Sequence, residues 1–267
     1  MNIGIKMILS IGAAAALCSC GQGEKKTQDN EFHYLLDEFA DLKVIRFKVP
    51  GWDALSLRQK EYAYHLSEAA KLGRDITWDQ YCKWNLPIRH VVEDILNEYK
   101  GDRECADFQD FTVYAKRLFF ANGIHHHYSE DKFFPECPRE YFQSLMKAVG
   151  DGDKAAELLE VIYSPDIYPQ RRSTSKTGDI VELSAVNFYD GVNREEVEKY
   201  YNSLMDPNDK TPVSYGLNTK VVKENGKVVE KPWKVGGIYG PALERICAEL
   251  EKAAEVAETD LQKKAIG

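Results

Sequence analysis

The sequence lacks an excess of positive charge. Its 267 residues contain 35 Lys and Arg against 43 Asp and Glu, which gives a formal net charge of −8. A general nucleic-acid-binding protein needs a broad basic surface for phosphates, so this balance argues against that function class. After the first twenty residues, no apolar run approaches the roughly 20 residues that span a bilayer, and mean hydropathy is −0.47. We therefore expect the bulk of the chain to be a soluble globular body.

The sequence also lacks several catalytic signatures. No histidine is followed by glutamate, whereas a zincin needs His-Glu-x-x-His on one helix. There is no Walker loop, no Gly-x-Gly-x-x-Gly turn after a strand and no Gly-x-Ser-x-Gly elbow. From the residues alone, the chain therefore contains no complete catalytic set.

The first nineteen residues have the layout of an export signal. Lys6 is their one charged residue and precedes the apolar stretch from Met7 to Ala16. The next four residues, Leu17-Cys18-Ser19-Cys20, resemble a bacterial lipobox, and Cys20 is the better acyl acceptor because Cys18 follows the bulky Leu17. We expect a lipoprotein signal peptide over 1–19, a lipid on Cys20 and a flexible tether over 20–31. An ordinary signal peptide with incidental cysteines is the alternative.

Export places the body in the cell envelope, lipid-anchored on a periplasmic or outer-membrane face. Disulfides are permitted there but not required. The remaining cysteines contain no Cys-x-x-Cys pair and are spaced too widely for a compact zinc module; they are Cys82, Cys105, Cys137 and Cys247. We expect them to be buried thiols.

Local patterns in the first half predict mostly helices. Residues 43–49 alternate as in a strand, with Ile45, Phe47 and Val49 on one face, and end at a Pro-Gly turn. Ser56 is expected to cap a helix that runs to about Leu72. Further helices are expected over 87–100 and 108–121, after Pro138 and after Asp153, with a loop over 165–179.

The second half changes character. Residues 180–188 are apolar and β-prone, and Asn193 with Glu196 predicts a capping box for a helix through Tyr200. Asn225-Gly226 supplies the turn of a β-hairpin over 220–230. Apolar residues recur at helical spacing from Pro241 to the last residue without a stop signal, so we interpret the sequence as cut short. The predicted fold class is α+β, a mostly helical lobe with a small antiparallel β-barrel or sheet.

Three adjacent histidines form the conspicuous polar cluster. His125, His126 and His127 follow the 108–121 helix, and imidazole is a common zinc ligand. Successive residues point in different directions, however, and a three-histidine site usually draws its ligands from separated positions. We favour a loop that lines a cleft over a metal site. A surface loop with capping or packing duties is the alternative.

Two long strings carry a resemblance to a known family. They are Glu61-Tyr-Ala-Tyr-His-Leu-Ser-Glu-Ala-Ala70 with Gly73, and Asn122-Gly-Ile-His-His-His-Tyr-Ser-Glu-Asp-Lys-Phe-Phe-Pro135. Both closely resemble the N-terminal part of the dipeptidyl peptidase III family of zinc metallopeptidases. The downstream order, from Asn187-Phe-Tyr-Asp-Gly-Val-Asn193 through the hairpin, is also similar. The resemblance covers roughly residue 39 to the end and is closest to Bacteroides-type bacterial members.

The resemblance implies a two-lobed exopeptidase that releases dipeptides from the N-termini of short peptides. Residues 32–267 would supply the lower lobe. The family's zinc motifs, His-Glu-x-x-Gly-His and a later Glu-Glu, do not occur in this sequence, so the complete enzyme's zinc would lie on a missing C-terminal portion. No catalytic or metal-binding residue is therefore expected in this chain, which alone is expected to be inactive.

The family's aromatic position facing the cleft matches Tyr128, and His126 and His127 would add polar contacts to a bound peptide. Tyr128 packing the loop onto its own lobe is the alternative. Two other functions stay open for the chain: a non-catalytic lipoprotein that binds peptides, and an inactive truncation product.

Overall fold

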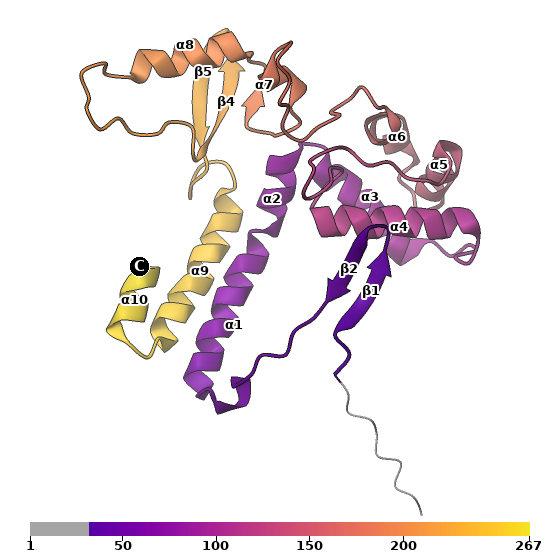
Figure 1. The fold of residues 1–267 in the computed structure, drawn as a ribbon, viewed down its shortest axis with the longest axis horizontal. Coiled ribbons are helices and arrows are strands. Elements are labelled where there is room, and N and C mark those ends of the chain that lie inside the picture. The colour runs from indigo at the N-terminus through magenta and orange to yellow at the C-terminus, as the bar shows by residue number, and fades with distance from the viewer. Residues whose placement is uncertain (1–31) are drawn as a thin grey trace, which may run out of the picture.

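The structure, a computed structural model, describes residues 32–267, in which five helices enclose the largest core (Figure 1). These helices are α2 (Arg74–Tyr81), α3 (Asn85–Glu98), α4 (Ala106–Ala121), α5 (Arg139–Ala148) and α6 (Ala155–Tyr163). The predicted signal peptide, the acylated Cys20 and the tether lie outside the described residues.

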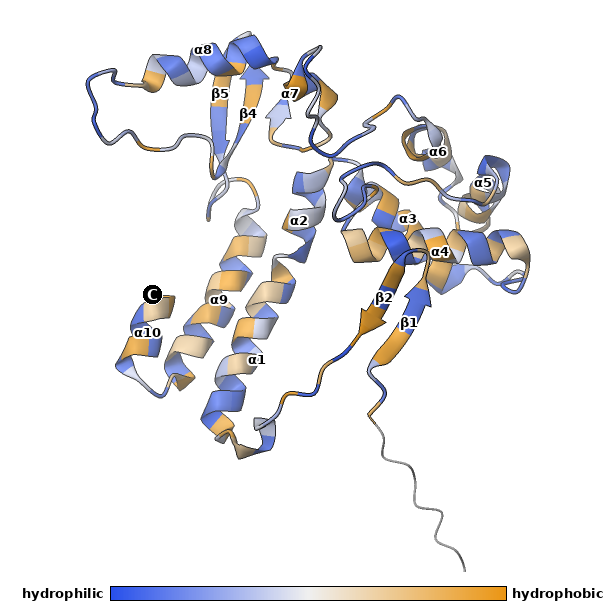
Figure 2. Ribbon diagram, viewed as in Figure 1, coloured by the Kyte–Doolittle hydropathy of each residue, from blue (hydrophilic) through white to orange (hydrophobic). Residues whose placement is uncertain are grey.

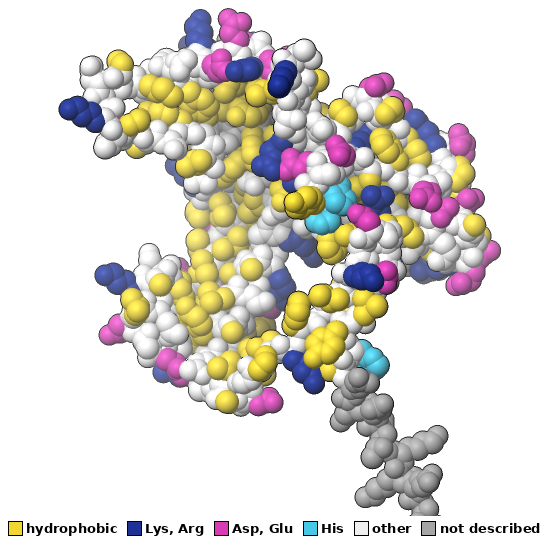
Figure 3. Space-filling model, in the orientation of Figure 1, with side chains coloured by type: hydrophobic (Ala, Val, Ile, Leu, Met, Phe, Trp, Pro, Cys, Tyr) yellow, Lys and Arg dark blue, Asp and Glu magenta, His cyan; other side chains and the backbone are white. Residues whose placement is uncertain are grey.

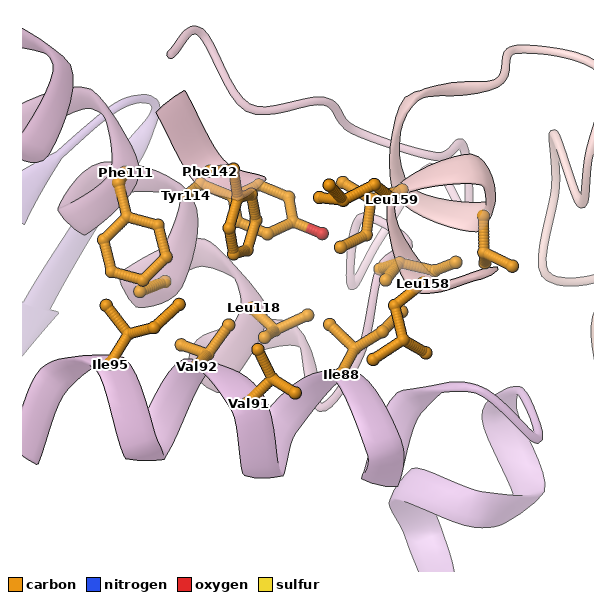
Figure 4. Close-up of a cluster of buried hydrophobic side chains, with 14 of the residues drawn as sticks. Ile88, Val91, Val92, Ile95, Phe111, Tyr114, Leu118, Phe142, Leu158 and Leu159 are labelled. Carbon is orange, nitrogen blue, oxygen red and sulfur yellow. The ribbon is translucent and has the colours of Figure 1, made fainter. Parts of the chain in front are cut away.

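The core of this helical body follows from the 3.6-residue period of its sequence. Ile88, Val91, Val92 and Ile95 place one face of α3 against α4, α5 and α6 (Figure 4). Each such side chain contributes about 1.5–3 kcal/mol when fully buried. The predicted helices over 87–100 and 108–121 are confirmed, although α3 begins two residues before Pro87. The helices expected after Pro138 and Asp153 are confirmed as α5 and α6, with the short 3-10 turn η2 (Gly152–Lys154) before α6.

An N-terminal hairpin lies against α4. Strands β1 (Leu35–Phe39) and β2 (Leu42–Ile45) pair antiparallel, and Lys116 of α4 bonds Asp37 at 2.8 Å. The predicted strand over 43–49 is wrong in its second half: the chain leaves the hairpin at Ile45, and only one further backbone bond, from Arg46 to the carbonyl of Tyr34, continues the pairing. The partner strand β1 was not predicted.

A second, smaller core supports a three-stranded sheet. Strands β3 (Tyr189–Asp190), β4 (Thr219–Glu224) and β5 (Lys227–Pro232) lie in that order, with α7 (Ile180–Leu183) and α8 (Arg194–Leu204) beside them. The hairpin with its Asn225-Gly226 turn and the capping box at Asn193 are confirmed. Residues 180–188 are not a strand at their start, because the Asp179 side chain accepts hydrogen bonds from two backbone N–H groups and caps α7 instead.

Two long helices from distant parts of the sequence lie side by side. Helix α1 (Leu57–Leu72) follows the 3-10 turn η1 (Trp52–Ala54), starts at the predicted Ser56 cap and packs along α9 (Gly240–Val256). The predicted single helix from Pro241 to the last residue is wrong. It breaks at Ala257, where the Arg58 side chain binds the last carbonyls of α9, and α10 (Asp260–Ile266) begins anew.

The architecture confirms the α+β class, with helices predominating. Within residues 32–267 the strands form two small open sheets and no closed barrel, and β3 runs parallel to β4, so the second sheet is mixed rather than antiparallel. No helix in the described part of the chain has the length and apolarity needed to cross a bilayer. The four cysteines there are free: Cys82 and Cys137 are buried as expected, but Cys105 is half-buried and Cys247 is exposed.

Candidate functional site: the histidine loop

Residues 122–134, here called the histidine loop, begin where α4 ends. Asn122 takes the left-handed conformation (φ 57°), which Asn tolerates, and ends the helix. Gly123 follows with φ 148°, and a Cβ there would lie 2.2 Å from the amide nitrogen of Asn85. The buried Asn85 side chain donates to the carbonyl of Trp78 at 3.0 Å and accepts from the N–H of Ile124 at 3.2 Å. The start of the loop is therefore fixed to the helical body.

His125 is buried inside the lobe, at 2% exposure. Its Nε2 donates to the carbonyl of Tyr168 at 2.8 Å, so Nδ1 is unprotonated, and it has no hydrogen-bond partner among the described residues. Burial is the main reason that the pKa of His125 falls to about 4. The ring is a neutral packing group and does not reach the loop surface.

His126 organises the loop turn. Its Nδ1 accepts from the backbone N–H groups of Tyr128 (3.2 Å) and Ser129 (3.0 Å). Because this nitrogen accepts, Nε2 carries the proton and donates to Asp41 of the β1–β2 turn at 3.1 Å. His126 thus closes the loop turn with Nδ1 and ties the loop to the N-terminal hairpin with Nε2.

His127 and Tyr128 lie at the exposed tip. The His127 ring stands edge-on to Phe120 at a centroid distance of 5.0 Å, and burial together with the neighbouring His126 lowers its pKa. The Tyr128 side chain is 88% exposed. The ring therefore makes little packing contact with the lobe that carries it.

The far end of the loop is held by ion pairs. Glu130, itself at φ 66°, pairs with Arg172 and, at 2.6 Å, with the buried Arg171. The Arg172 hydrogen bond, followed by that of Arg171, lowers the pKa of Glu130 to about 2. The Arg171 guanidinium also stacks over the Tyr81 ring at 4.2 Å.

Lys132 completes this anchoring without a carboxylate. Its ammonium donates to the carbonyls of Ser164 (2.6 Å) and Ile167 (2.8 Å) and is 7% exposed. Burial lowers the pKa of Lys132 to about 8. The histidine loop is therefore rigid at both ends and exposed at the tip.

A hollow adjoins the base of the loop. It has a volume of about 530 Å³ and lies between the helical body and the three-stranded sheet. Its wall includes Lys83, Tyr168, Ala185, Asn187, Tyr189 and Asn193. Tyr168 also binds His125 through its carbonyl, so the loop and the hollow share a wall.

The three histidines do not converge on one point, although the rings of His126 and His127 lie side by side with centroids 4.4 Å apart. His125 faces the lobe interior, His126 faces Asp41, and His127 faces Phe120. Among residues 32–267, no group of three His, Cys, Asp or Glu side chains is placed to hold a metal ion.

Sequence reasoning located the loop but missed the residues that shape it. Asn85, Asp41 and Arg171 lie in three segments outside the loop and contact it only in the folded chain. Glu130 lies within the loop, but its partners Arg171 and Arg172 are 41 and 42 residues away. The local signal that could have been used is Asn122-Gly123, a common helix-ending pair.

A comparison with solved structures finds that the chain is similar to one described as the structure of DPP III from Caldithrix abyssi. The identity is 20% and the TM-score 0.49, and the match covers 80% of this chain. The chain spans about 30% of the length of that protein. No protein-family model matches the chain, and no curated protein matches it. A likeness of this level transfers no function to the histidine loop.

Proposed function

We propose that the chain is the N-terminal part of a dipeptidyl peptidase III-like zinc exopeptidase of the Bacteroides type, and that its histidine loop contacts short peptide substrates. The observation that carries the proposal is the string from Asn122 to Pro135, which closely resembles that family. In the structure this string forms a loop with fixed ends and an exposed aromatic tip.

The geometry supports peptide contact at the tip. A loop that is already ordered loses little conformational freedom on binding, and the Glu130 ion pairs and the Asn85 hydrogen bonds provide that order. Tyr128 then offers an exposed ring, with the imidazole of His127 beside it for polar contacts. The imidazole of His126 holds the turn in place, because both of its ring nitrogens are already hydrogen-bonded. Buried His125 contributes only to the packing beneath them.

The described residues do not fit the zinc that the resemblance implies. Their carboxylates, imidazoles and thiols form no three-ligand group, so no catalytic step is assigned to this chain. In the proposal, the zinc and the groups that act with it belong to a C-terminal portion beyond residue 267.

Exposed apolar side chains of the sheet region support such a portion. Figure 3 shows hydrophobic side chains gathered on this region, above a bay that separates it from the α9–α10 helices. The large exposed apolar side chains of this region are Leu204, Met205, Val213, Leu217 and Val235. Apolar side chains that gather on one exposed face typically mark an interaction site.

Peptide binding by the full chain tests the role of the loop. We expect a fluorescent tetrapeptide to bind saturably, and Tyr128→Ala to weaken binding at least fivefold in anisotropy titrations. Tyr64→Ala is the matched control, because Tyr64 is another exposed tyrosine but lies on α1. Equal losses in both variants, or no saturable binding, would contradict the proposed loop function.

An assay of peptide hydrolysis distinguishes a fragment of an enzyme from a protein that only binds peptides. The locus is sequenced beyond codon 267, and its longest product is assayed on a dipeptidyl-arylamide with and without a chelator. Chelator-sensitive activity, together with a His-Glu-x-x-Gly-His motif, is the expected result. A genuine stop codon and peptide binding without activity would instead favour the non-catalytic lipoprotein.

We also propose that Cys20 carries the lipid that anchors the chain in the cell envelope. The lipobox-like order of Leu17 to Cys20 supports this. Labelled palmitate should enter the wild-type chain and the Cys18→Ser variant, but not Cys20→Ser. Labelling that persists in Cys20→Ser would exclude this anchor.

A further inference from the structure

The N-terminal hairpin and the segment after it expose apolar side chains that sequence patterning would place inside a core. Phe47 is 74% exposed, Val49 66% and Trp52 43%. Together with Phe32 they line an open hollow of about 910 Å³. Residues 32–36 and 45–54 are called the hairpin patch below; their side of the hairpin is apolar in Figure 2 and forms a cluster near the start of the described chain in Figure 3.

The apolar surface continues onto the paired strands. Leu35 and Ile45 are register partners, so they lie on the same face, and each is about half exposed. Tyr34 and Leu36 are exposed as well. No described element covers these side chains, although the opposite end of the same hairpin, at Phe39 and Leu42, is buried.

The charge of the patch is opposite to that of the chain. Arg46 lies over the Phe32 ring at 4.5 Å and Lys48 at 5.0 Å, and neither side chain forms an ion pair among residues 32–267. Asp53 is the one acidic residue between positions 45 and 54, whereas the whole sequence carries a net charge of −8. Aromatic side chains beside unpaired cations suit the interface of an anionic bilayer.

The position of the patch agrees with that partner. It contains the first described residues, and Phe32 is twelve residues after Cys20. A fully extended chain of that length spans about 40 Å. A lipid on Cys20 would therefore hold the patch close to the bilayer, and such tethering raises the effective concentration of a weak surface contact.

We propose that the hairpin patch docks on the anionic phospholipid surface next to the anchor, with Phe47, Val49 and Trp52 at the depth of the headgroups. Arg46 and Lys48 pair with lipid phosphates there. The inference rests on the proposed acylation of Cys20 for its proximity, while the patch itself is built from described residues. Docking orients the body relative to the membrane and covers an apolar surface that would otherwise stay in water.

The test reconstitutes the full chain into vesicles of phosphatidylglycerol and phosphatidylcholine that contain bromine-labelled acyl chains. Bromine quenches nearby tryptophan fluorescence, and Trp52→Phe identifies the share that belongs to Trp52. We expect the wild-type chain to show quenching that Trp52→Phe removes. We also expect Trp52 quenching to fall at least twofold in vesicles of pure phosphatidylcholine. It should likewise fall at least twofold in the double variant Phe47→Ser with Val49→Ser.

The matched control is Val213→Ser with Leu217→Ser, which removes two equally exposed apolar side chains from the sheet region and should leave Trp52 quenching unchanged. Arg46→Gln with Lys48→Gln should abolish the preference for phosphatidylglycerol, whereas Lys227→Gln at the exposed β4–β5 turn should not.

The outcomes separate the patch from the anchor. Palmitate incorporation without Trp52 quenching would overturn the docking and leave the anchor intact. Missing palmitate would overturn the anchor, and quenching by added vesicles would then still decide the patch. Concentration-dependent dimers that Phe47→Ser dissolves, without quenching, would show that a second copy covers the patch and would also overturn the proposal.

Discussion

Gly123 shows how one backbone position fixes the histidine loop. Its φ of 148° disfavours any side chain, and its missing Cβ leaves room for the buried Asn85 amide. We expect Gly123→Ala to lower the free energy of unfolding by about 2–4 kcal/mol, because strain and a steric collision add. Urea unfolding measures the loss. Gly150→Ala is the control, since Gly150 also has positive φ (94°) but no atom near its Cβ position, and it should lose only about 1 kcal/mol.

Glu130 gives the loop an acid-sensitive clamp. Its pKa in the folded chain, about 2, lies below its ordinary value of 4.5. The ion pairs of Glu130 with Arg171 and Arg172 therefore contribute their full stabilisation above about pH 4.5, and this contribution is lost as the pH falls towards 2. We expect Glu130→Gln to cost about 1–2 kcal/mol at pH 7, because it leaves the buried Arg171 without its carboxylate. The difference from wild type should shrink to nothing near pH 2.

Unfolding curves at several pH values measure that difference. Glu198→Gln is the control, because its pair with Arg194 is exposed, so its loss should change the free energy of unfolding little at any pH. A Glu130→Gln deficit that is constant from pH 7 to pH 3 would contradict the clamp.

The position of the candidate site in the chain could be predicted from the sequence, but the arrangement of its side chains could not. The string around His126 and Tyr128 is local, so sequence alone located the loop. The burial of His125 depends on a carbonyl 43 residues away, and the loop turn depends on Asp41, which is 85 residues from His126. Such long-range contacts leave no periodic or spacing signal in a single sequence.

At the scale of elements, the accurate predictions are those of helix caps and turns, which depend on short-range hydrogen bonds between a side chain and the backbone. Ser56 with Gln59 and Asn193 with Glu196 form complete capping boxes, and Asn225 takes the positive φ that its turn needs. Where tertiary contacts overrode the pattern, prediction failed. The break after α9 coincides with the binding of its terminal carbonyls by Arg58, which the apolar spacing could not indicate.

Thr259 starts α10 after that break. Its hydroxyl accepts from the N–H of Gln262, whose side chain accepts in return from the N–H of Thr259. We expect Thr259→Ala to weaken this short helix by about 1 kcal/mol, which corresponds to roughly fivefold faster hydrogen exchange over 263–266. Thr259→Ser should keep the wild-type rate. Unchanged exchange in Thr259→Ala would show that packing rather than the cap maintains α10.

Residues 32–267 form two separate cores linked by a small polar junction. The larger core lies among α2 to α6, and the smaller one lies among valines and tyrosines around the sheet. Asp79 of α2 accepts from the Tyr239 hydroxyl at 2.6 Å and from the Asn187 amide at 3.1 Å. Tyr239 immediately precedes α9, so this carboxylate connects the helical body, the sheet region and the long helix pair.

Cores of such different size should not melt together. We expect two calorimetric transitions, with the sheet region unfolding first, and hydrogen exchange by peptide segment assigns them. Tyr239→Phe removes one junction hydrogen bond and should lower the first transition by about 4–8 °C for a loss of about 1 kcal/mol. The second transition should not move.

Tyr163→Phe is the reciprocal variant, since the Tyr163 hydroxyl donates to the Cys137 carbonyl inside the helical body. It should lower only the second transition. A single transition that both variants shift equally would mean that the junction couples the two cores into one cooperative unit.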